Sequence, residues 1–132
     1  LRFNKTRFYR DSNFNKSLVT DMYRIWVKNN INANNAEVIG AYTDNQIVGF
    51  ITYELPSKNI PKIGLFSVKS NVENLGVGSQ LLNKCIMDLM QKKKDYLSVV
   101  TQKSNLKALK FYLKNDFKIK SSYNWFHKWY LN

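Results

Sequence analysis

A β-rich stretch that leads through two closely spaced glycines into an amphipathic helix constrains the fold of this chain most strongly. The stretch KIGLFSVK is mostly apolar, which is typical of a strand in the middle of a sheet. After the loop that holds Gly76 and Gly78, apolar residues recur at helical spacing from Gly76 or Val77 to about Gln91. This succession predicts an α/β arrangement in which the helix packs on a sheet.

The rest of the chain alternates between helical and β-rich patterns. Apolar residues at helical spacing predict a helix from about Asn15 to Lys28, followed by the Asn-rich loop NINANNAE. Two β-rich runs, EVIGAYT and IVGFITYEL, flank DNQ as in a hairpin. Further on we expect a short strand at YLSVV, a helix at SNLKALKFYLKN, and two closing strands, FKIKSSY and WFHKWYL. The predicted fold is α/β (or α+β), with a mixed, mostly antiparallel sheet flanked by helices in the order α-β-β-β-α-β-α-β-β.

Length and composition set further bounds. Residues 1–132 suit a single domain, and Leu1 in place of Met leads us to expect that an N-terminal part is missing. We expect no membrane segment, because no apolar run approaches about 20 residues. The one cysteine, Cys85, lies on an apolar helix stripe, which indicates packing and fits a cytoplasmic location. We also expect no metal, because no His, Cys, Asp or Glu residues have the spacing of metal ligands.

Charge is the strongest signal in the composition. The chain has 21 Lys and Arg against 9 Asp and Glu, a formal net charge of +12. Such a field attracts anions, whether nucleic acid, an acidic membrane or phosphorylated small molecules. AT-rich coding also enriches a chain in Lys, Asn, Ile and Tyr without a functional cause. Nucleic-acid binding would rest on this charge alone, since no recognised motif accompanies it, and we do not expect it.

The glycine loop and a later tyrosine are the candidate chemical groups. A helix that starts after Gly76 and Gly78 presents free amides to an anion, and Ser79 can add a hydroxyl. The chain lacks both the G-x-G-x-x-G and the Walker A patterns, so the loop alone leaves phosphate binding and a simple turn both open. Tyr112, on a helix that follows a strand, is protonated at neutral pH and could give a proton to a departing thiolate, although a core position is also compatible.

In these segments the chain resembles the GNAT acetyltransferase superfamily, from about Phe14 onward. IGLFSVKSNVENLGVGSQLL stands where that superfamily has its acetyl-CoA pyrophosphate loop, Gln/Arg-x-x-Gly-x-Gly/Ala. NLKALKFYLKNDF resembles its N-x-x-A-x-x-x-Y-x-x-x-G-F helix. The TQ before that helix and the closing WFHKW are similar to bacterial dTDP-amino-sugar N-acetyltransferases of the dTDP-fucosamine type, as is FYRDSNFNKSLVTDMYRIWVKNNI on the acceptor side.

The resemblance implies an acetyl-CoA-dependent N-acetyltransferase that acts on the amine of a nucleotide-linked amino sugar. Acetyl-CoA would lie between splayed central strands, LFSV and LSVV, and Tyr112 would be the catalytic acid. Glu54, Gln102 and His127 are the candidates for the acceptor side, and the aromatic segment WFHKWY is a candidate homodimer contact. The coenzyme-binding residues implied are Phe66, Val68, Leu75, Gly76, Val77, Gly78, Ser79 and Asn105.

Three residues depart from the superfamily pattern. Glu73 replaces the Arg or Gln, Asn74 replaces a frequent Gly, and Asp116 replaces the Gly before Phe117. Asn and Asp tolerate the left-handed conformation best among the other residues, so the backbone can keep its course at positions 74 and 116. We expect the Glu73 carboxylate to point away from a bound diphosphate and to lower the affinity. These departures keep open a non-catalytic GNAT-like binding module. A GNAT enzyme that acts on a protein N-terminus or another small amine is a separate alternative.

Overall fold

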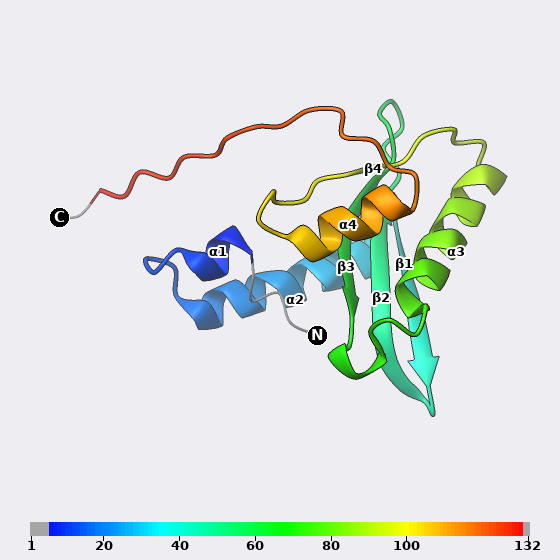
Figure 1. Cartoon of the computed structure of the whole chain (residues 1–132), viewed down its shortest axis with the longest axis horizontal. Helices are drawn as coiled ribbons and strands as arrows, with labels where there is room; N and C mark the ends of the chain where they lie inside the picture. The colour runs from blue at the N-terminus through cyan, green and yellow to red at the C-terminus, as the bar shows by residue number, and fades with distance from the viewer. Residues whose placement is uncertain (1–5, 131–132) are drawn as a thin grey trace.

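In the computed structural model, which describes residues 6–130, four strands form one sheet that lies between helices (Figure 1). The strands follow one another across the sheet in chain order: β1 (Ala36–Thr43), β2 (Gln46–Glu54), β3 (Lys62–Val68) and β4 (Ser98–Val99). The first three strands are antiparallel, and β4 runs parallel to β3. The predicted mixed, mostly antiparallel sheet is confirmed, with the strand KIGLFSVK in its interior.

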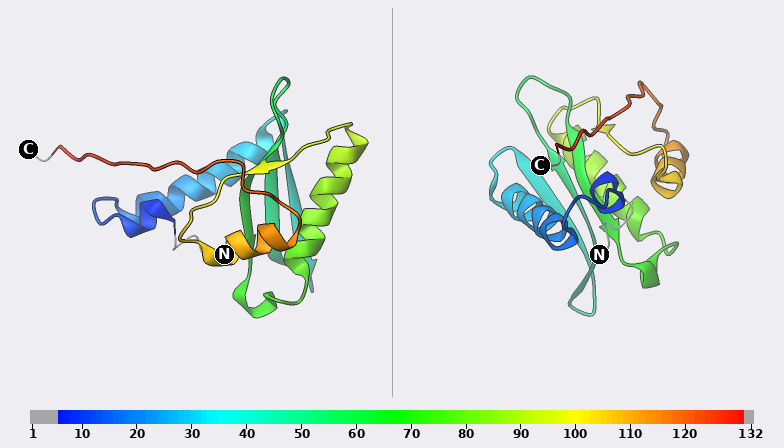
Figure 2. Two further views of the ribbon diagram at one scale, coloured as in Figure 1. Left: turned by 45° about the horizontal axis from the view of Figure 1, so that its top comes forward. Right: turned by 90° about the vertical axis from the view of Figure 1, so that its left-hand side faces the viewer.

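Helices lie on both faces of the sheet, with α2 on one face and α3 and α4 on the other (Figure 2). The helices are α1 (Arg7–Arg10), α2 (Lys16–Asn32), α3 (Val77–Gln91) and α4 (Leu106–Lys114), with a 3-10 turn η1 (Ser70–Val72). The bounds predicted for α3 are confirmed. Within residues 6–130, no helix has both the length and the apolar character needed to cross a membrane.

The second helix is longer than its sequence pattern predicted. It begins where expected, because the Asn15 side chain accepts the amides of Ser17 and Leu18, but it continues to Asn32 through residues predicted as loop. Asn30 explains the extension. Its side chain is buried against the sheet and donates to Thr52 Oγ1 at 3.1 Å, which stabilises the last turn of the helix. The short α1 was not predicted.

Two buried clusters hold the helices to the sheet. On the face toward α2 the cluster consists of Val19, Tyr23, Phe50 and Leu65. On the other face it consists of Ile51, Tyr53, Ile63, Leu81, Leu82, Cys85, Leu89 and Tyr112. Cys85 is fully buried there, and burial raises the pKa of its thiol to about 12. Its predicted role in packing is therefore confirmed.

The hairpin between β1 and β2 has the predicted position. Asp44 and Asn45 both have positive φ, 50° and 61°, as a two-residue turn between twisted strands requires. Asn and Asp adopt this conformation more readily than other residues with a side chain, which explains why the turn forms at this dipeptide.

A bulge in β3 determines where β3 and β4 separate. Ile51 pairs with Phe66 and Tyr53 with Ile63, so Thr52 alone on β2 stands opposite Gly64 and Leu65 on β3. A bulge bends its strand and increases the local twist. β4 pairs with β3 only at Lys62 and Ile63, immediately before the bulge. From Gly64 onward β3 therefore has no strand partner on the β4 side among the described residues, and the central strands splay as predicted.

The two predicted closing strands are wrong. Residues 118–130 run as an extended segment without a strand, away from the sheet and past α1 (Figure 1). Leu131, the end of the predicted strand WFHKWYL, lies outside the described residues. β-prone residues form a strand only when another strand pairs with their backbone. Here the segment is instead attached through side chains, with the Arg7 guanidinium 4.7 Å from the centre of the Trp125 ring and Trp129 bonded to Asp11.

Candidate functional site

The start of α3 presents main-chain amides that no helical carbonyl accepts. The first bond inside this helix runs from the Gln80 amide to the Gly76 carbonyl at 3.0 Å, so the amides of Val77, Gly78 and Ser79 precede the helical ladder. No side chain within residues 6–130 caps Gly76, and the first turn contains no acidic residue. These amides and the helix dipole can hold an anionic group.

Gly76 and Asn74 give the loop its shape. Gly76, the residue before α3, has φ of 83°, which is left-handed, and Asn74 has φ of 66°. The expectation that Asn74 adopts the left-handed conformation is confirmed, and it is also confirmed for Asp116, which follows α4 and has φ of 64°. Leu75, between Asn74 and Gly76, is exposed, and its main-chain amide donates to the Val72 carbonyl at 3.4 Å. The loop thus turns the chain from β3 into α3 with glycine required at position 76.

The free edge of β3 adds a second row of amides. The Leu65 amide bonds Thr52 Oγ1 at 2.8 Å and the Lys69 amide bonds the Val48 carbonyl at 2.7 Å, both toward β2. Amides alternate in direction along a strand, so those of Phe66 and Val68 face the opposite edge, where β4 has separated. This edge is where the two residues were predicted to bind a coenzyme arm.

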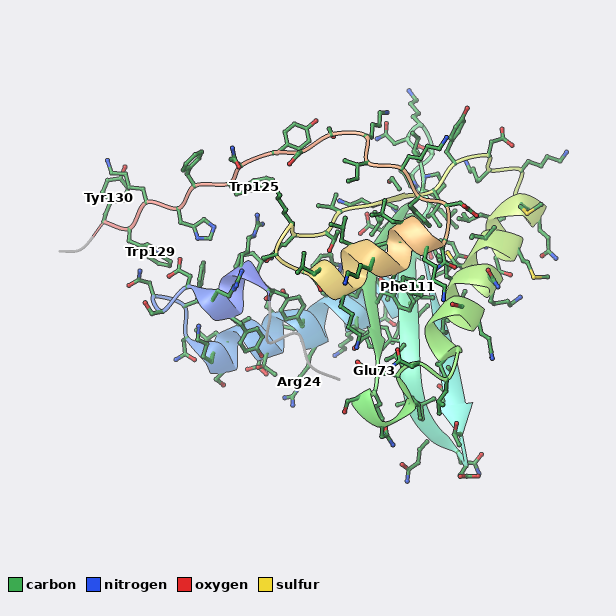
Figure 3. The ribbon with its side chains drawn as sticks, viewed as in Figure 1. Arg24, Glu73, Phe111, Trp125, Trp129 and Tyr130 are labelled. Atoms are coloured by element: carbon green, nitrogen blue, oxygen red, sulfur yellow. The ribbon has the colours of Figure 1, made fainter. Side chains whose placement is uncertain are left out.

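Aromatic side chains fill the space between β3, α3 and α4. The rings of Phe66 and Phe111 are 5.4 Å apart in an edge-to-face arrangement, and Phe111 and Tyr112 are 5.5 Å apart. A β-carbon at Gly78 would lie 3.4 Å from Cε2 of Phe111 and 3.7 Å from Cζ of Phe66. The start of α3, the middle of β3 and α4 therefore meet at one place. Figure 3 labels Phe111 on α4, beside β3.

Tyr112 belongs to this meeting point. Its ring lies 6.4 Å from that of Phe66 and 5.3 Å from that of Phe117, and only 7% of the residue is exposed. Burial, followed by the nearby Cys85, raises the pKa of the Tyr112 phenol above its ordinary value of 10.0. The phenol therefore keeps its proton at neutral pH, as a proton donor must. The core interpretation of Tyr112 is confirmed, and its catalytic role remains a prediction.

Glu73 lies between the glycine loop and α4. Its carboxylate forms an ion pair with the Lys107 ammonium group in the first turn of α4. Glu73 is labelled in Figure 3 on the loop that precedes α3. The carboxylate is thus directed to a cation on the neighbouring helix. Sequence reasoning did not include Lys107, although an acidic residue beside an anion site indicates that a cation should accompany it.

Asn105 has the structural role that its position indicates. It precedes α4, and its side-chain oxygen accepts the Ala108 amide at 3.3 Å, as a helix cap does. The main-chain amide of Asn105 donates to the Gln102 carbonyl at 2.9 Å, which connects the predicted acceptor-side residue Gln102 to the start of this helix. A contact between the side-chain NH2 group of Asn105 and the coenzyme stays a prediction.

Two of the predicted acceptor-side residues are far from each other in the fold. Glu54 ends β2, in register with Ala36 and Lys62, at the end of the sheet opposite to the glycine loop. His127 lies instead against the turn between α1 and α2, where its Nδ1 is 3.1 Å from Asp11 Oδ2. Gln102 lies in the loop before α4. The structure does not gather the three into one cluster.

The neighbourhood of His127 joins two distant parts of the chain. Asp11 Oδ2 also accepts the Trp129 indole at 3.1 Å, and the Phe14 ring packs edge-on against both Trp129 and His127, at 4.9 and 5.8 Å. Asp11 and Phe14 lie in FYRDSNF, and His127 and Trp129 lie in WFHKW. Both segments resembled sugar-nucleotide N-acetyltransferases, the first of them on the acceptor side. We name Asp11, Phe14, His127 and Trp129 the terminal cluster.

In the part of the chain that the structure describes, no group of three or more His, Cys, Asp or Glu side chains could hold a metal ion.

Comparison with known proteins gives one family. Residues 5–117 match the model of the Acetyltransferase (GNAT) family. Spore coat polysaccharide biosynthesis protein SpsD of Bacillus subtilis (strain 168) is 24% identical over 127 residues, which cover 96% of this chain and 44% of that protein. The chain spans less than half the length of the curated relatives it matches.

Two solved structures illustrate the likeness. The aminoglycoside acetyltransferase AAC(6')-Iy, in complex with the bisubstrate analog CoA-S-monomethyl-acetylneamine, superposes with a TM-score of 0.69 at 16% identity, over 82% of this chain and 79% of that one. A Bacillus anthracis protein assigned as a streptothricin acetyltransferase, in complex with acetyl coenzyme A, superposes with a TM-score of 0.61 at 30% identity, over 66% of this chain and 49% of that one. At 16% identity, the likeness to AAC(6')-Iy shows a shared fold and nothing more.

Proposed function

The chain belongs to the acetyltransferase (GNAT) family, and on this premise we propose that it transfers the acetyl group of acetyl-CoA to the amine of a nucleotide-linked amino sugar. The observation that carries the proposal is the position of the start of α3 beside the free edge of β3. Acetyl-CoA combines a diphosphate with an arm that contains amide groups. A helix start suits the diphosphate, and an unpaired strand edge suits the arm.

Each part of the coenzyme has candidate partners in the chain. The amides of Val77, Gly78 and Ser79 would hold the diphosphate, and the loop residues Leu75 and Gly76 would shape its approach. The amides of Phe66 and Val68 would pair with the arm, and Asn105 would contact the coenzyme with the amide group that does not cap α4. Two observations support the fit of the coenzyme to these residues. In the described residues no side chain caps Gly76, and the pairing between β3 and β4 stops at Ile63.

Tyr112 would be the catalytic acid. When bound, acetyl-CoA supplies an activated acyl thioester. Tyr112 donates its phenolic proton to the sulfur as the carbon–sulfur bond breaks, and it regains a proton through solvent from the amine once the carbon–nitrogen bond has formed. An amide of Phe66 or Val68 would stabilise negative charge on the carbonyl oxygen. The pKa of Tyr112 lies above its ordinary value, so the phenol is protonated before transfer, and the contact with the sulfur must offset its weaker acidity.

The preference for an anionic acceptor rests on charge and on the relative that spans nearly the whole chain. A net charge of +12 favours the approach of a nucleotide-linked sugar and opposes that of a cationic aminoglycoside or polyamine. SpsD is named for the biosynthesis of spore coat polysaccharide, a process that uses sugars. Gln102, His127 and, with less support from its position, Glu54 are the side chains proposed for the acceptor.

Acetyl transfer to a panel of amines tests the proposal. The protein is incubated with acetyl-CoA and, separately, with dTDP-linked amino sugars, an aminoglycoside and a peptide with a free N-terminus, and the products are weighed by mass spectrometry. We expect acetylation of at least one dTDP-amino sugar. Tyr112→Phe should lose most of the turnover and keep its affinity for the coenzyme. Tyr96→Phe, which changes an exposed tyrosine on the loop before β4, is the matched control.

Different results separate the alternatives. Acetylation of the peptide or the aminoglycoside alone would replace the sugar with another amine. Binding of acetyl-CoA without transfer to any amine would favour a binding module. Full activity in Tyr112→Phe would remove the catalytic role of Tyr112 and leave the rest of the proposal in place.

A further inference from the structure

The ion pair between Glu73 and Lys107 connects the two elements on either side of the proposed coenzyme site. Glu73 directly follows η1, three residues before Gly76, and Lys107 is the second residue of α4. The Lys107 side chain is 64% exposed, so neighbouring atoms leave it room to reorient, whereas only 33% of the Glu73 side chain is exposed. The pair therefore joins a partly buried carboxylate on the loop to an exposed cation on α4.

Local structure does not favour this position for a lysine. The start of a helix carries partial positive charge, which repels a cation in the first turn. Glu73 offsets that repulsion, because its carboxylate is the partner of the ammonium group. The lysine is consequently held at the loop by the one residue of the loop whose charge opposes phosphate binding.

The same pair changes the electrostatics of the glycine loop. An unpaired carboxylate next to the amides of Val77, Gly78 and Ser79 would repel a diphosphate. With Lys107 beside it, the local charge is neutral before a ligand arrives. A lysine on a flexible stem can exchange one anion for another, and a diphosphate carries more charge than a single carboxylate.

We infer that Lys107 is a phosphate-binding residue, held at the loop by Glu73 in the free protein and transferred to the coenzyme's phosphates when acetyl-CoA binds. The inference rests on the proposed function. It assigns to a side chain of α4 the cationic role that position 73 cannot have, since that position is acidic. The diphosphate is the expected partner, because the amides that would hold it belong to the same loop.

Binding measurements on four proteins test the inference. Affinity for acetyl-CoA is measured by calorimetry at two salt concentrations for the wild type, Lys107→Met, Glu73→Gln and Lys110→Met, a control that removes a lysine one turn further along α4. Lys107→Met should bind about 10-fold more weakly, because it loses the cation and leaves Glu73 unpaired, and its binding should depend less on salt. Glu73→Gln should bind as tightly as the wild type or a few-fold more tightly. Lys110→Met should match the wild type.

Two further ligands identify the group that Lys107 meets. S-acetylpantetheine lacks all the phosphates of the coenzyme, and all four proteins should bind it equally. Dephospho-CoA keeps the diphosphate and lacks the 3'-phosphate, so the full effect of Lys107→Met with this ligand assigns the contact to the diphosphate. Loss of the effect with dephospho-CoA would assign it to the 3'-phosphate and overturn the diphosphate contact.

The failures are distinct. Wild-type affinity in Lys107→Met, or an equal loss for S-acetylpantetheine, would overturn the inference and leave acetyl-CoA binding intact. An equal loss for S-acetylpantetheine would mean that the pair only supports the position of α4, and thermal unfolding without ligand would show it as reduced stability. No binding of acetyl-CoA by the wild type would overturn the proposed function itself.

Discussion

Thr52 Oγ1 accepts the main-chain amide of Leu65 at 2.8 Å, at the position where two residues of β3 stand opposite one residue of β2. The same oxygen accepts the Asn30 side chain from α2 at 3.1 Å. The Thr52 hydroxyl thus stabilises the bulge in β3 through two hydrogen bonds, and the bulge has two consequences for the strand. It ends the pairing of β3 with β4, and it turns the Phe66 and Val68 amides toward the open edge. A side chain on the α2 face therefore helps to shape the candidate site on the other.

Removal of this hydroxyl should destabilise the protein. Thr52 is fully buried, so Thr52→Val keeps the shape and leaves the Leu65 amide and the Asn30 side chain without an acceptor. A buried donor without a partner costs about 1–3 kcal/mol, and we expect a loss of about 3 kcal/mol in the free energy of unfolding. Urea denaturation measures it. Thr52→Ser, which retains the oxygen, should lose less than half as much; equal losses in the two variants would contradict the role of the hydrogen bonds.

Glycine should be required at position 76 because of the backbone conformation there, and not because a side chain would clash with its neighbours. A β-carbon at this position would meet only Gln80 Nε2, at 3.9 Å, but φ is 83°. Gly76→Ala should therefore lower the free energy of unfolding by about 1 kcal/mol through left-handed strain. It should also weaken acetyl-CoA binding, because the α3 amides shift. Gly76→Asn should be milder in both respects, since Asn tolerates this conformation. Thermal unfolding and calorimetry compare the two, and an Asn variant as impaired as the Ala variant would argue for a side-chain clash.

The pKa shifts in the core predict instability in alkaline solution. Burial raises the pKa of Cys85 from 9.0 and that of Tyr53 from 10.0, each to about 12, and raises the pKa of Tyr112 as well. These groups are neutral when the protein is folded. Their contribution to stability is complete below pH 9 and is lost as the pH rises from 9 toward 12, because the unfolded chain releases these protons first.

The measurement is the free energy of unfolding between pH 8 and 12. Each group that ionises only in the unfolded chain adds a slope of about 1.4 kcal/mol per pH unit. Cys85→Ala should be less stable throughout, because it leaves a cavity, but its stability should fall less steeply between pH 9 and 10. An identical slope in wild type and variant would show that Cys85 does not contribute.

Local sequence signals account for the elements that were predicted correctly. The apolar stripe of α3, the Asp44–Asn45 turn and the left-handed residues Asn74 and Asp116 all depend on residues close in the chain. The position of the glycine loop at the start of α3 follows from the same signals. Its binding role, and that of Tyr112, depend on a ligand and remain predictions.

The features that were missed depend on contacts between distant residues. Thr52 in a β-rich run does not differ from any other strand threonine, and its bulge is visible only when Asn30 and Leu65 are in place. The ion pair of Glu73 with Lys107 likewise joins residues that no local pattern connects. The segment 118–130 has a β-prone composition, but a strand needs a partner that composition does not supply.

The terminal cluster is the attachment of that segment, and Asp11 is its centre. The hydrogen bond from His127, followed by that from the Asn13 amide, lowers the pKa of Asp11 below its ordinary 3.8. A lowered pKa means that the attachment is complete above pH 3.8 and is lost as the pH falls through the folded-state value. Asp11→Ala should have the same effect at neutral pH, because Trp129 and His127 lose their shared acceptor.

The indole N–H signal of Trp129 in an NMR spectrum reports this attachment directly. In Asp11→Ala we expect it to move to the position of a free indole and to exchange faster with solvent, while the signals of α3 stay in place. Asp21→Ala removes an exposed carboxylate that pairs with Arg24 on α2, and it should leave the indole signal unchanged. If Asp11→Ala also leaves the signal unchanged, the Phe14 ring rather than the carboxylate holds the segment, and Phe14→Ala should then release it.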